Sequence, residues 1–130
     1  MALEVEDGTG KANAEAYISV ADADTYFSDR GYTLWATLST TEKEQTLRRS
    51  TDYMEAVYGP QWLGEKATTT QALSWPRTGT DYASDVVPRP VVRANAELAF
   101  RAASGELAPD LGAQVKSETV GPISVTYADG

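Results

Sequence analysis

Apolar residues recur every three to four positions over three stretches of the chain, and helix start and stop signals bound each stretch. The first predicted helix begins at Ser19, which has Asp22 three residues later as in a capping box, and it ends at Gly31. The second begins at Ser39 and runs to about Tyr58, before a Gly-Pro pair. This spacing predicts amphipathic helices that bury one face each.

The inner stripe of the second and longest helix is expected to consist of Leu47, Thr51, Met54 and Tyr58, with Ser50, Tyr53 and Val57 beside it. Trp35 and Leu38 come just before the Ser39 cap. We expect their side chains to fold over this helix.

The third predicted helix starts near Pro88 and Pro90 and ends at Ser104-Gly105. Its inner face consists of Val91, Ala94, Asn95, Leu98 and Ala102, and Val92, Ala96, Ala99 and Ala103 widen it. An alanine-rich face lets helices approach closely, either within the subunit or across an interface. Val91, Ala94 and Leu98 are therefore candidate interface residues.

A period of two appears at both ends of the chain. Leu3–Val5 predicts a short strand, and Val115–Thr119 and Ile123–Tyr127 predict a hairpin around Gly121-Pro122. A hairpin alone is marginal in water, so the N-terminal strand could supply a third strand, from the same subunit or a neighbour. Ile123, Val125 and Tyr127 share one face and are candidate interface residues.

These patterns together predict a mainly α fold, a small bundle of three to four helices. A short β-hairpin or small sheet from the N- and C-terminal segments completes it. We expect a single domain over residues 1–130, with a helical core at about 19–105 and the hairpin at about 114–127.

The segment Gln71–Gly79 reads Q-A-L-S-W-P-R-T-G and joins the second and third helices. Pro76 fixes its own backbone and keeps Trp75 out of a helix, so that the indole can point inward. Trp75, Pro76 and Arg77 are expected to form a structural anchor, with Arg77 paired to a carboxylate. The alternative is a Trp75 ring that stacks on a ligand.

The neighbouring connections are expected to be loops. In the loop 61–70, Trp62 and Leu63 provide the apolar contact, and the segment 80–87 is a polar surface loop. Gly8-Thr9-Gly10-Lys11 suggests a phosphate-binding loop, but that motif needs a glycine at position 5, where this chain has Val5. A turn is the better interpretation.

The composition narrows the possible chemistry. The chain of 130 residues has neither cysteine nor histidine, which excludes disulfides, thiolate and histidine catalysis and the ordinary zinc sites. The acidic residues are scattered over caps and polar helix faces, so we expect no enzyme activity, no cofactor and no metal site. No apolar run approaches a membrane span or a signal peptide, and we expect no membrane partner.

Single-strand binding is a possible function, because bases stack on aromatic rings. The rings that could serve are those of Trp35, Trp62, Trp75 and Tyr82. Few basic residues accompany them, namely Lys66, Arg77 and Arg89. The net charge of −8, from 19 acidic and 11 basic residues, disfavours a phosphate backbone as the main partner.

Several segments, in their order and spacing, resemble the head-tail connector, or adaptor, proteins of tailed phages. They are L-E-V-E-D-G-T-G, A-Y-I-S-V-A-D-A-D, L-R-R-S-T-D-Y-M-E-A-V-Y, W-P-R-T-G, V-V-R-A-N-A-E-L-A and V-K-S-E-T-V-G-P-I-S-V-T-Y. Proteins of this family are often described as DnaT-like single-stranded-DNA-binding proteins, which is the alternative function. The resemblance covers nearly the whole chain.

The resemblance implies a structural virion protein of the phage neck that completes the head. It would be assembled in the host cytoplasm as a homo-oligomeric ring, twelve-fold like the portal on which it sits. The implied partners are other copies of the chain, the portal protein and a downstream tail or neck protein. DNA would pass through the lumen without specific binding. Similar proteins usually continue past the V-T-Y segment with a tail that attaches to the portal.

Overall fold

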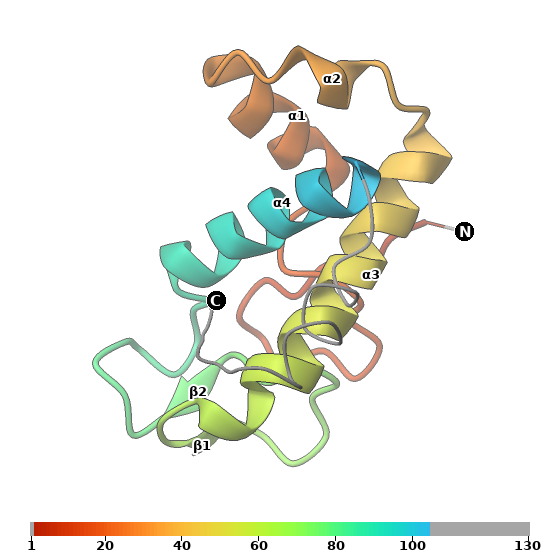
Figure 1. Ribbon diagram of the computed structural model, residues 1–130. Helices are drawn as coiled ribbons and strands as arrows, with labels where there is room; N and C mark the ends of the chain where they lie inside the picture. The colour runs from red at the N-terminus through yellow and green to blue at the C-terminus, as the bar shows by residue number, and fades with distance from the viewer. Residues whose placement is uncertain (1, 105–130) are drawn as a thin grey trace, which may run out of the picture.

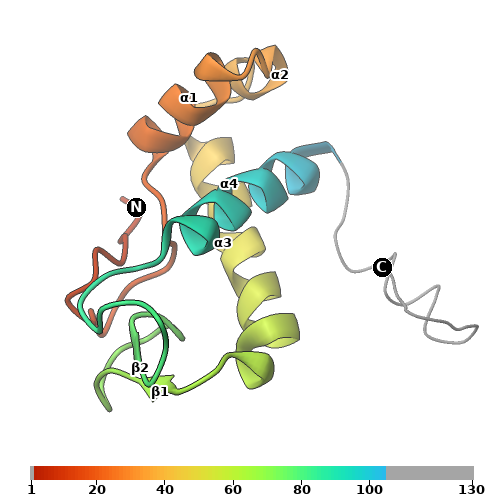
Figure 2. The same cartoon turned by 90° about the vertical axis from the view of Figure 1, so that its left-hand side faces the viewer.

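The computed structural model describes residues 2–104 and is mainly helical, as the sequence predicts. Its elements are α1 (Val20–Asp29), α2 (Thr33–Ala36), α3 (Thr40–Tyr58), the 3-10 helix η1 (Gly59–Gln61), β1 (Glu65–Lys66), β2 (Arg77–Thr78) and α4 (Arg89–Ser104). In Figures 1 and 2, α4 crosses α3, while α1 and α2 lie at one end and the small sheet lies at the other.

The predicted caps of the first two long helices are confirmed. The Ser19 hydroxyl accepts a hydrogen bond from the Asp22 amide at 3.0 Å, which satisfies one of the free N–H groups at the start of α1. Ser39 and Glu42 form a complete capping box at the start of α3. These local bonds explain why the sequence alone locates both helix starts.

The short helix α2 was not predicted. It brings Trp35 onto the core, where the indole is buried and packs in the same cluster as Leu47 of α3. The expectation that Trp35 folds over the long helix is therefore confirmed, and Leu38 is partly buried against the same cluster.

The apolar face of α3 is shorter than its sequence pattern suggests. The buried side chains of this helix are Thr46, Leu47, Ser50, Thr51 and Met54. Tyr58 was expected on the inner stripe but is 40% exposed, because the last turn of α3 extends beyond the region that α4 covers. Three of these five buried residues carry a hydroxyl group, and buried hydroxyl groups need hydrogen-bond partners.

The core consists of two clusters of buried residues. The first lies between α1, α2, α3 and α4 and contains Ala16, Ile18, Ala23, Phe27, Trp35, Leu47, Ala96 and Ala99. The second lies toward the sheet and contains Ala14, Tyr17, Met54, Leu73, Trp75 and Val91. The alanines of α4 face α3 within the subunit, so the close approach predicted from this face is confirmed inside the molecule.

Between the two clusters, Asn95 lies fully buried at the crossing of α3 and α4. Its amide nitrogen donates to the hydroxyls of Ser50 at 2.6 Å and Thr51 at 3.0 Å, and its amide oxygen accepts from the Tyr17 backbone N–H at 2.8 Å. A single side chain therefore joins α4, α3 and the N-terminal segment. Every polar group in this contact has a partner, as burial requires.

The N-terminal segment differs from the prediction. Leu3–Val5 forms no strand; Val5 makes one isolated parallel bridge with Ala16. The buried carboxylate of Glu6 determines this path, because it accepts hydrogen bonds from the amides of Gly8, Gly10 and Lys11 at 2.8–2.9 Å. The turn interpretation of this loop is confirmed, since the amides that would contact a phosphate bind Glu6 instead.

The two-stranded sheet of the described residues comes from the middle of the chain. Glu65 pairs with Thr78 and Lys66 with Arg77, in antiparallel order. The segment 61–70 was expected to be a loop but contains a short strand. Two paired residues are too few to produce a recognisable alternation of apolar and polar residues in the sequence. The predicted C-terminal hairpin lies outside the described residues.

We predict that Asn95→Ala destabilises the fold by at least about 2 kcal/mol. The change leaves the buried Tyr17 amide without its acceptor and two hydroxyls without their donor, and each stranded group costs about 1–3 kcal/mol. Urea unfolding followed by circular dichroism measures this loss. Arg93→Gln, an exposed position on the same helix, is the control and should change stability by less than about 0.5 kcal/mol. Equal stabilities for the two variants would contradict the role of Asn95.

Candidate functional site

The W-P-R segment lies inside the protein. Trp75 and Arg77 are 5% and 8% exposed, and Pro76, which follows a cis peptide bond, is fully buried. We expected Arg77 to pair with a carboxylate, but this prediction is wrong. Its guanidinium donates to the main-chain carbonyls of Leu63, Gly64 and Ser74 at 2.8–3.0 Å. A planar group with several donors can bridge three carbonyls of a folded loop, and a carboxylate partner is then unnecessary.

A second set of hydrogen bonds fixes this segment to α3. The Tyr17 hydroxyl donates to Glu55 at 2.6 Å, and the same carboxylate accepts from both the amide and the hydroxyl of Ser74. The Tyr17 oxygen in turn accepts from the Trp75 amide at 3.2 Å. Burial and the neighbouring Glu55 raise the pKa of Tyr17 well above its ordinary value. This tyrosine therefore stays protonated and serves as a structural link.

The aromatic set expected to stack on bases is mostly inaccessible. Trp35 and Trp75 are buried, Trp62 is half-buried, and only Tyr82 is exposed. The rings of Trp62 and Tyr82 contact that of Trp75 edge-on, with centroids 5.5 and 6.1 Å away. Base stacking needs open ring faces, so this cluster works as packing around Trp75.

The predicted interface residues have different positions in the fold. Val91 is buried in the core cluster on the sheet side, while Ala94 and Leu98 are partly buried against that cluster. Ile123, Val125 and Tyr127 lie outside the described residues. The participation of these residues in an interface stays a prediction.

A basic face that sequence reasoning missed lies along the outer side of α4. Arg89, Arg93 and Arg101 are exposed there, Arg93 four residues after Arg89 and Arg101 eight residues further on. Arg30, which directly follows α1, lies near Arg93, since both act on Tyr26, and its guanidinium is 3.8 Å from the centre of the Tyr26 ring. Burial and a hydrogen bond to Glu97 raise the pKa of Tyr26, and the charges of Arg30 and Arg93 act in the opposite direction.

Rings accompany these arginines at one end of α4. Tyr32 is 37% exposed, and its ring lies 5.1 Å from that of the partly buried Phe100. We name the set of Arg30, Arg89, Arg93, Arg101, Tyr26, Tyr32 and Phe100 the arginine face. The spacing of Arg89 and Arg93 is visible in the sequence. That Tyr26 and Arg30, from α1 and its C-terminal cap, lie beside these arginines is decided only by tertiary packing.

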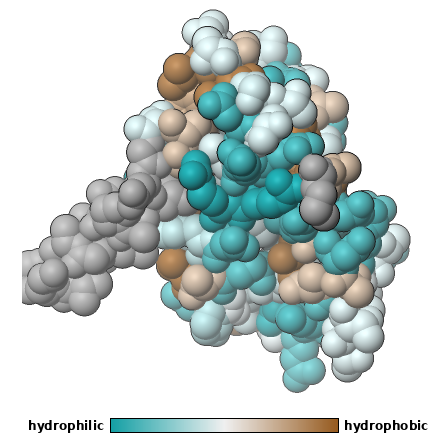
Figure 3. Space-filling view, turned by 90° about the vertical axis from the view of Figure 1, so that its right-hand side faces the viewer, coloured by the Kyte–Doolittle hydropathy of each residue, from teal (hydrophilic) through white to brown (hydrophobic). Residues whose placement is uncertain are grey.

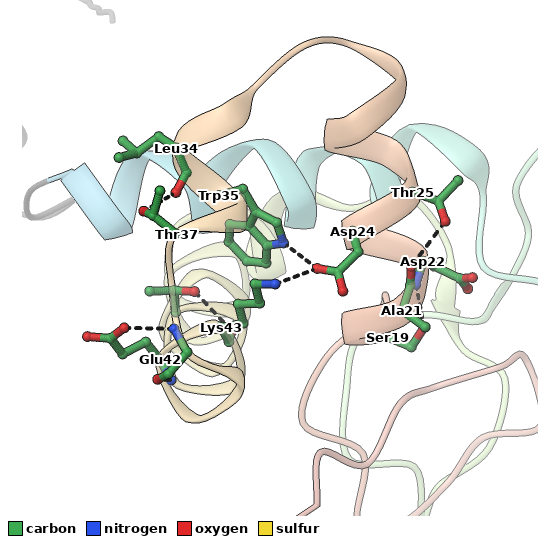
Figure 4. A network of polar contacts seen from close by, with 12 residues as sticks. Ser19, Ala21, Asp22, Asp24, Thr25, Leu34, Trp35, Thr37, Glu42 and Lys43 are labelled. Atoms are coloured by element: carbon green, nitrogen blue, oxygen red, sulfur yellow. Dashed lines mark hydrogen bonds and ion pairs between the residues drawn. The ribbon is translucent and has the colours of Figure 1, made fainter.

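A hollow of about 350 Å³ opens between α1 and α2. Its walls are Phe27, Gly31, Tyr32, Trp35 and Ala36, together with the polar residues Asp24, Ser28, Thr33 and Lys43. Figure 4 shows Trp35 and Lys43 pointing at Asp24, which accepts from the indole N–H at 2.8 Å and pairs with the ammonium at 2.9 Å. Phe27 and Trp35 are each only 1% exposed, so the accessible ring of the hollow is that of Tyr32, which is 37% exposed, and one ion pair lies beside it.

On the face seen from the α3 side (Figure 3), the surface is polar over the middle of the molecule and more apolar toward the ends. Figure 3, seen from the α3 side, shows hydrophilic residues over the middle of the molecule, hydrophobic residues near the α1–α2 end and smaller apolar spots in the lower half. The exposed large apolar side chains are Tyr32, Leu34, Tyr58, Leu63, Tyr82 and Val86. Leu63 was expected to be an apolar contact, but it is 78% exposed because Arg77 holds its backbone at a loop tip.

Within residues 2–104, no group of three or more acidic side chains is arranged to hold a metal ion. No helix in this part of the chain is long and apolar enough to cross a membrane.

The fold and these surfaces define a small helical protein whose polar motifs are used in its own packing. Residues 1–130 match the model of a protein family described as "Putative DnaT-like ssDNA binding protein". The chain belongs to this family. No curated protein and no solved structure matches the chain.

We predict that Trp75→Ala lowers the free energy of unfolding by about 3–5 kcal/mol, because it empties a buried aromatic site next to the Tyr17–Glu55 link. Differential scanning calorimetry would show this as a large fall in the melting temperature. Tyr82→Ala, which removes an exposed ring touching Trp75, is the matched control and should cost no more than about 1 kcal/mol. An unchanged melting temperature together with the loss of ligand binding would instead make Trp75 a contact residue for a ligand.

Proposed function

We propose that this protein is a neck adaptor of a tailed phage, a structural protein that assembles as a ring on the portal and links the capsid to the tail. The observation that carries the proposal is the order of the sequence segments that resemble such adaptors, together with what those segments do in the fold. Glu6, Tyr17, Trp75, Arg77 and Asn95 come from four of these segments, and all five residues are buried.

These five side chains take part in the packing of residues 2–104, as the buried residues of a structural protein do. A scaffold acts through the surfaces that it presents to other macromolecules, which suits a protein that assembles. The kind of assembly, a ring on the portal, is what the resemblance of these segments to adaptor proteins implies.

The charge balance supports the same function. With a formal net charge of −8, a ring of these subunits would repel the phosphate backbone of DNA in its lumen. DNA could then pass during packaging and ejection without being held. A protein whose purpose is to bind a nucleic acid strand usually carries the opposite charge.

The test is native mass spectrometry of the full chain, alone and with a portal protein. We expect a closed homo-oligomer or a ring that forms on the portal, with as many adaptor subunits as the portal requires. A chain that stays monomeric at high concentration and does not bind any portal would contradict the proposal.

Single-strand binding is the second candidate, and two observations favour it. The family description names this activity, and the arginine face combines four exposed guanidinium groups with the accessible Tyr32 ring. Phosphates would contact the arginines while a base stacks on the ring. The acidic residues elsewhere on the chain oppose this binding by long-range repulsion.

If the adaptor proposal holds, fluorescence anisotropy with an oligonucleotide at physiological salt should show nothing tighter than about 10⁻⁴–10⁻⁶ M, the range of non-specific contacts. Nanomolar affinity that Arg89→Gln with Arg93→Gln abolishes would favour the second candidate. In that case the double change should also make the salt dependence less steep, by about 0.7 for each lost phosphate contact. Lys66→Gln, an exposed basic residue on the sheet, is the control and should leave the affinity unchanged.

A further inference from the structure

Two surfaces of opposite charge lie on opposite sides of the crossing between α3 and α4. Ser50 of α3 and Asn95 of α4 meet at this crossing, where the Asn95 amide donates to the Ser50 hydroxyl at 2.6 Å. Arg93 precedes Asn95 by two residues. Asp52 follows Ser50 by two residues. Two residues correspond to a rotation of about 200° around a helix, so these two exposed side chains both point away from the crossing, in opposite directions.

The positive surface is the part of the arginine face that Arg89 and Arg93 form. These exposed residues are four positions apart, so their guanidinium groups lie on the same side of α4. Glu97, four residues after Arg93, accepts a hydrogen bond from the Tyr26 hydroxyl at 2.6 Å. Within residues 2–104, neither guanidinium forms an ion pair or a hydrogen bond. Both groups are therefore available to an anion from outside the subunit, and a carboxylate fits a guanidinium through two parallel hydrogen bonds.

The negative surface is centred on Asp52, with the carboxylates of Glu55 and Glu15 near it. Partial desolvation and the charges of Glu55 and Glu15 raise the pKa of Asp52, which means that its charged form is disfavoured in the isolated subunit. The two glutamates have hydrogen-bond donors inside the subunit. Asp52 has neither an ion pair nor a hydrogen bond within residues 2–104. A cation supplied from outside the subunit would offset this repulsion.

We propose that the arginine pair Arg89 and Arg93 of one subunit binds the Asp52 surface of the next copy of this chain. The two surfaces face away from each other, so one chain cannot join its own pair and the contact has to form between chains. It is head-to-tail, and repeated contacts of this kind close into a ring when the rotation between subunits allows it. The inference rests on the self-assembly proposed above and names its interface.

The overall charge explains why a local pairing of opposite charges matters here. Copies of a chain with a formal net charge of −8 repel one another at long range, and the approach of two copies is least unfavourable where a basic surface meets an acidic one. Exposed ion pairs add little binding energy in water, so these charges set the orientation of the contact more than its strength. A like-charge contact at the same place would oppose assembly.

The first experiment reverses one charge at a time in the full chain. Arg93→Glu and Asp52→Lys each place two like charges in the contact, so each should raise the dissociation constant for self-association at least about tenfold at low ionic strength. Analytical ultracentrifugation and native mass spectrometry measure this change. Lys66→Glu and Glu65→Lys make the same charge changes at exposed positions of β1 and should leave assembly intact. Circular dichroism checks folding, and Arg89→Glu replaces Arg93→Glu if that chain does not fold.

Combining both reversals in one chain tests whether the two surfaces meet each other. In the chain with Arg93→Glu and Asp52→Lys, the two surfaces again carry opposite charges, only exchanged, so self-association should recover most of what each single change removes. High salt should weaken the association of this chain and of the wild type alike. A double variant that assembles no better than either single variant would overturn the proposal.

Three further outcomes separate this interface from strand binding and from the proposed function. If Arg93→Glu abolishes nanomolar binding of an oligonucleotide while Asp52→Lys leaves self-association unchanged, the arginines serve a nucleic acid and the proposal is wrong. A wild-type ring, formed alone or on the portal, that keeps its mass and affinity after either single change would overturn this interface and leave the adaptor function standing. A wild-type chain that stays monomeric under all conditions, with portal included, would contradict both.

Discussion

The buried amide of Asn95 is the contact on which the arrangement of the helices depends. It lies where α4 crosses α3 and satisfies two hydroxyls and one backbone amide at distances of 2.6–3.0 Å. Apolar packing alone would let an alanine-rich helix slide along its neighbour, because small side chains interlock weakly. A polar group that has partners in only one register removes this freedom, since any shift would strand several buried donors.

The remaining polar motifs extend the same principle outward from the crossing. Asn95 holds the backbone of Tyr17, and the Tyr17 hydroxyl joins Glu55 of α3 to the backbone of Trp75. Arg77 then fixes the loop tip around Leu63 through main-chain carbonyls. A rigid connection thus runs from the centre of the helical core to an exposed apolar residue. The internal hydrogen bonds of this protein thereby fix the conformation of part of its exposed surface.

The surfaces differ in what they can recognise. The arginine face of α1 and α4 offers guanidinium groups and rings, which suit a phosphate backbone in spite of the acidic composition. Exposed apolar side chains such as Leu34 and Leu63 are of the kind that contacts with other copies of the chain would bury under the adaptor proposal. The family description points to the first kind of partner, and the resemblance to adaptor proteins points to the second.

The sequence by itself determined the features that depend on near neighbours along the chain. Helix α1, helix α3 and its capping box, and the burial of Trp35 followed from spacing and from bonds three residues apart. Only the tertiary structure decided which carbonyls Arg77 binds and how exposed Leu63 is. It also decided that the Glu6 carboxylate accepts hydrogen bonds from three backbone amides. These depend on groups that long-range folding brings together, and a carboxylate or guanidinium in a sequence does not reveal which of many possible partners the backbone will offer.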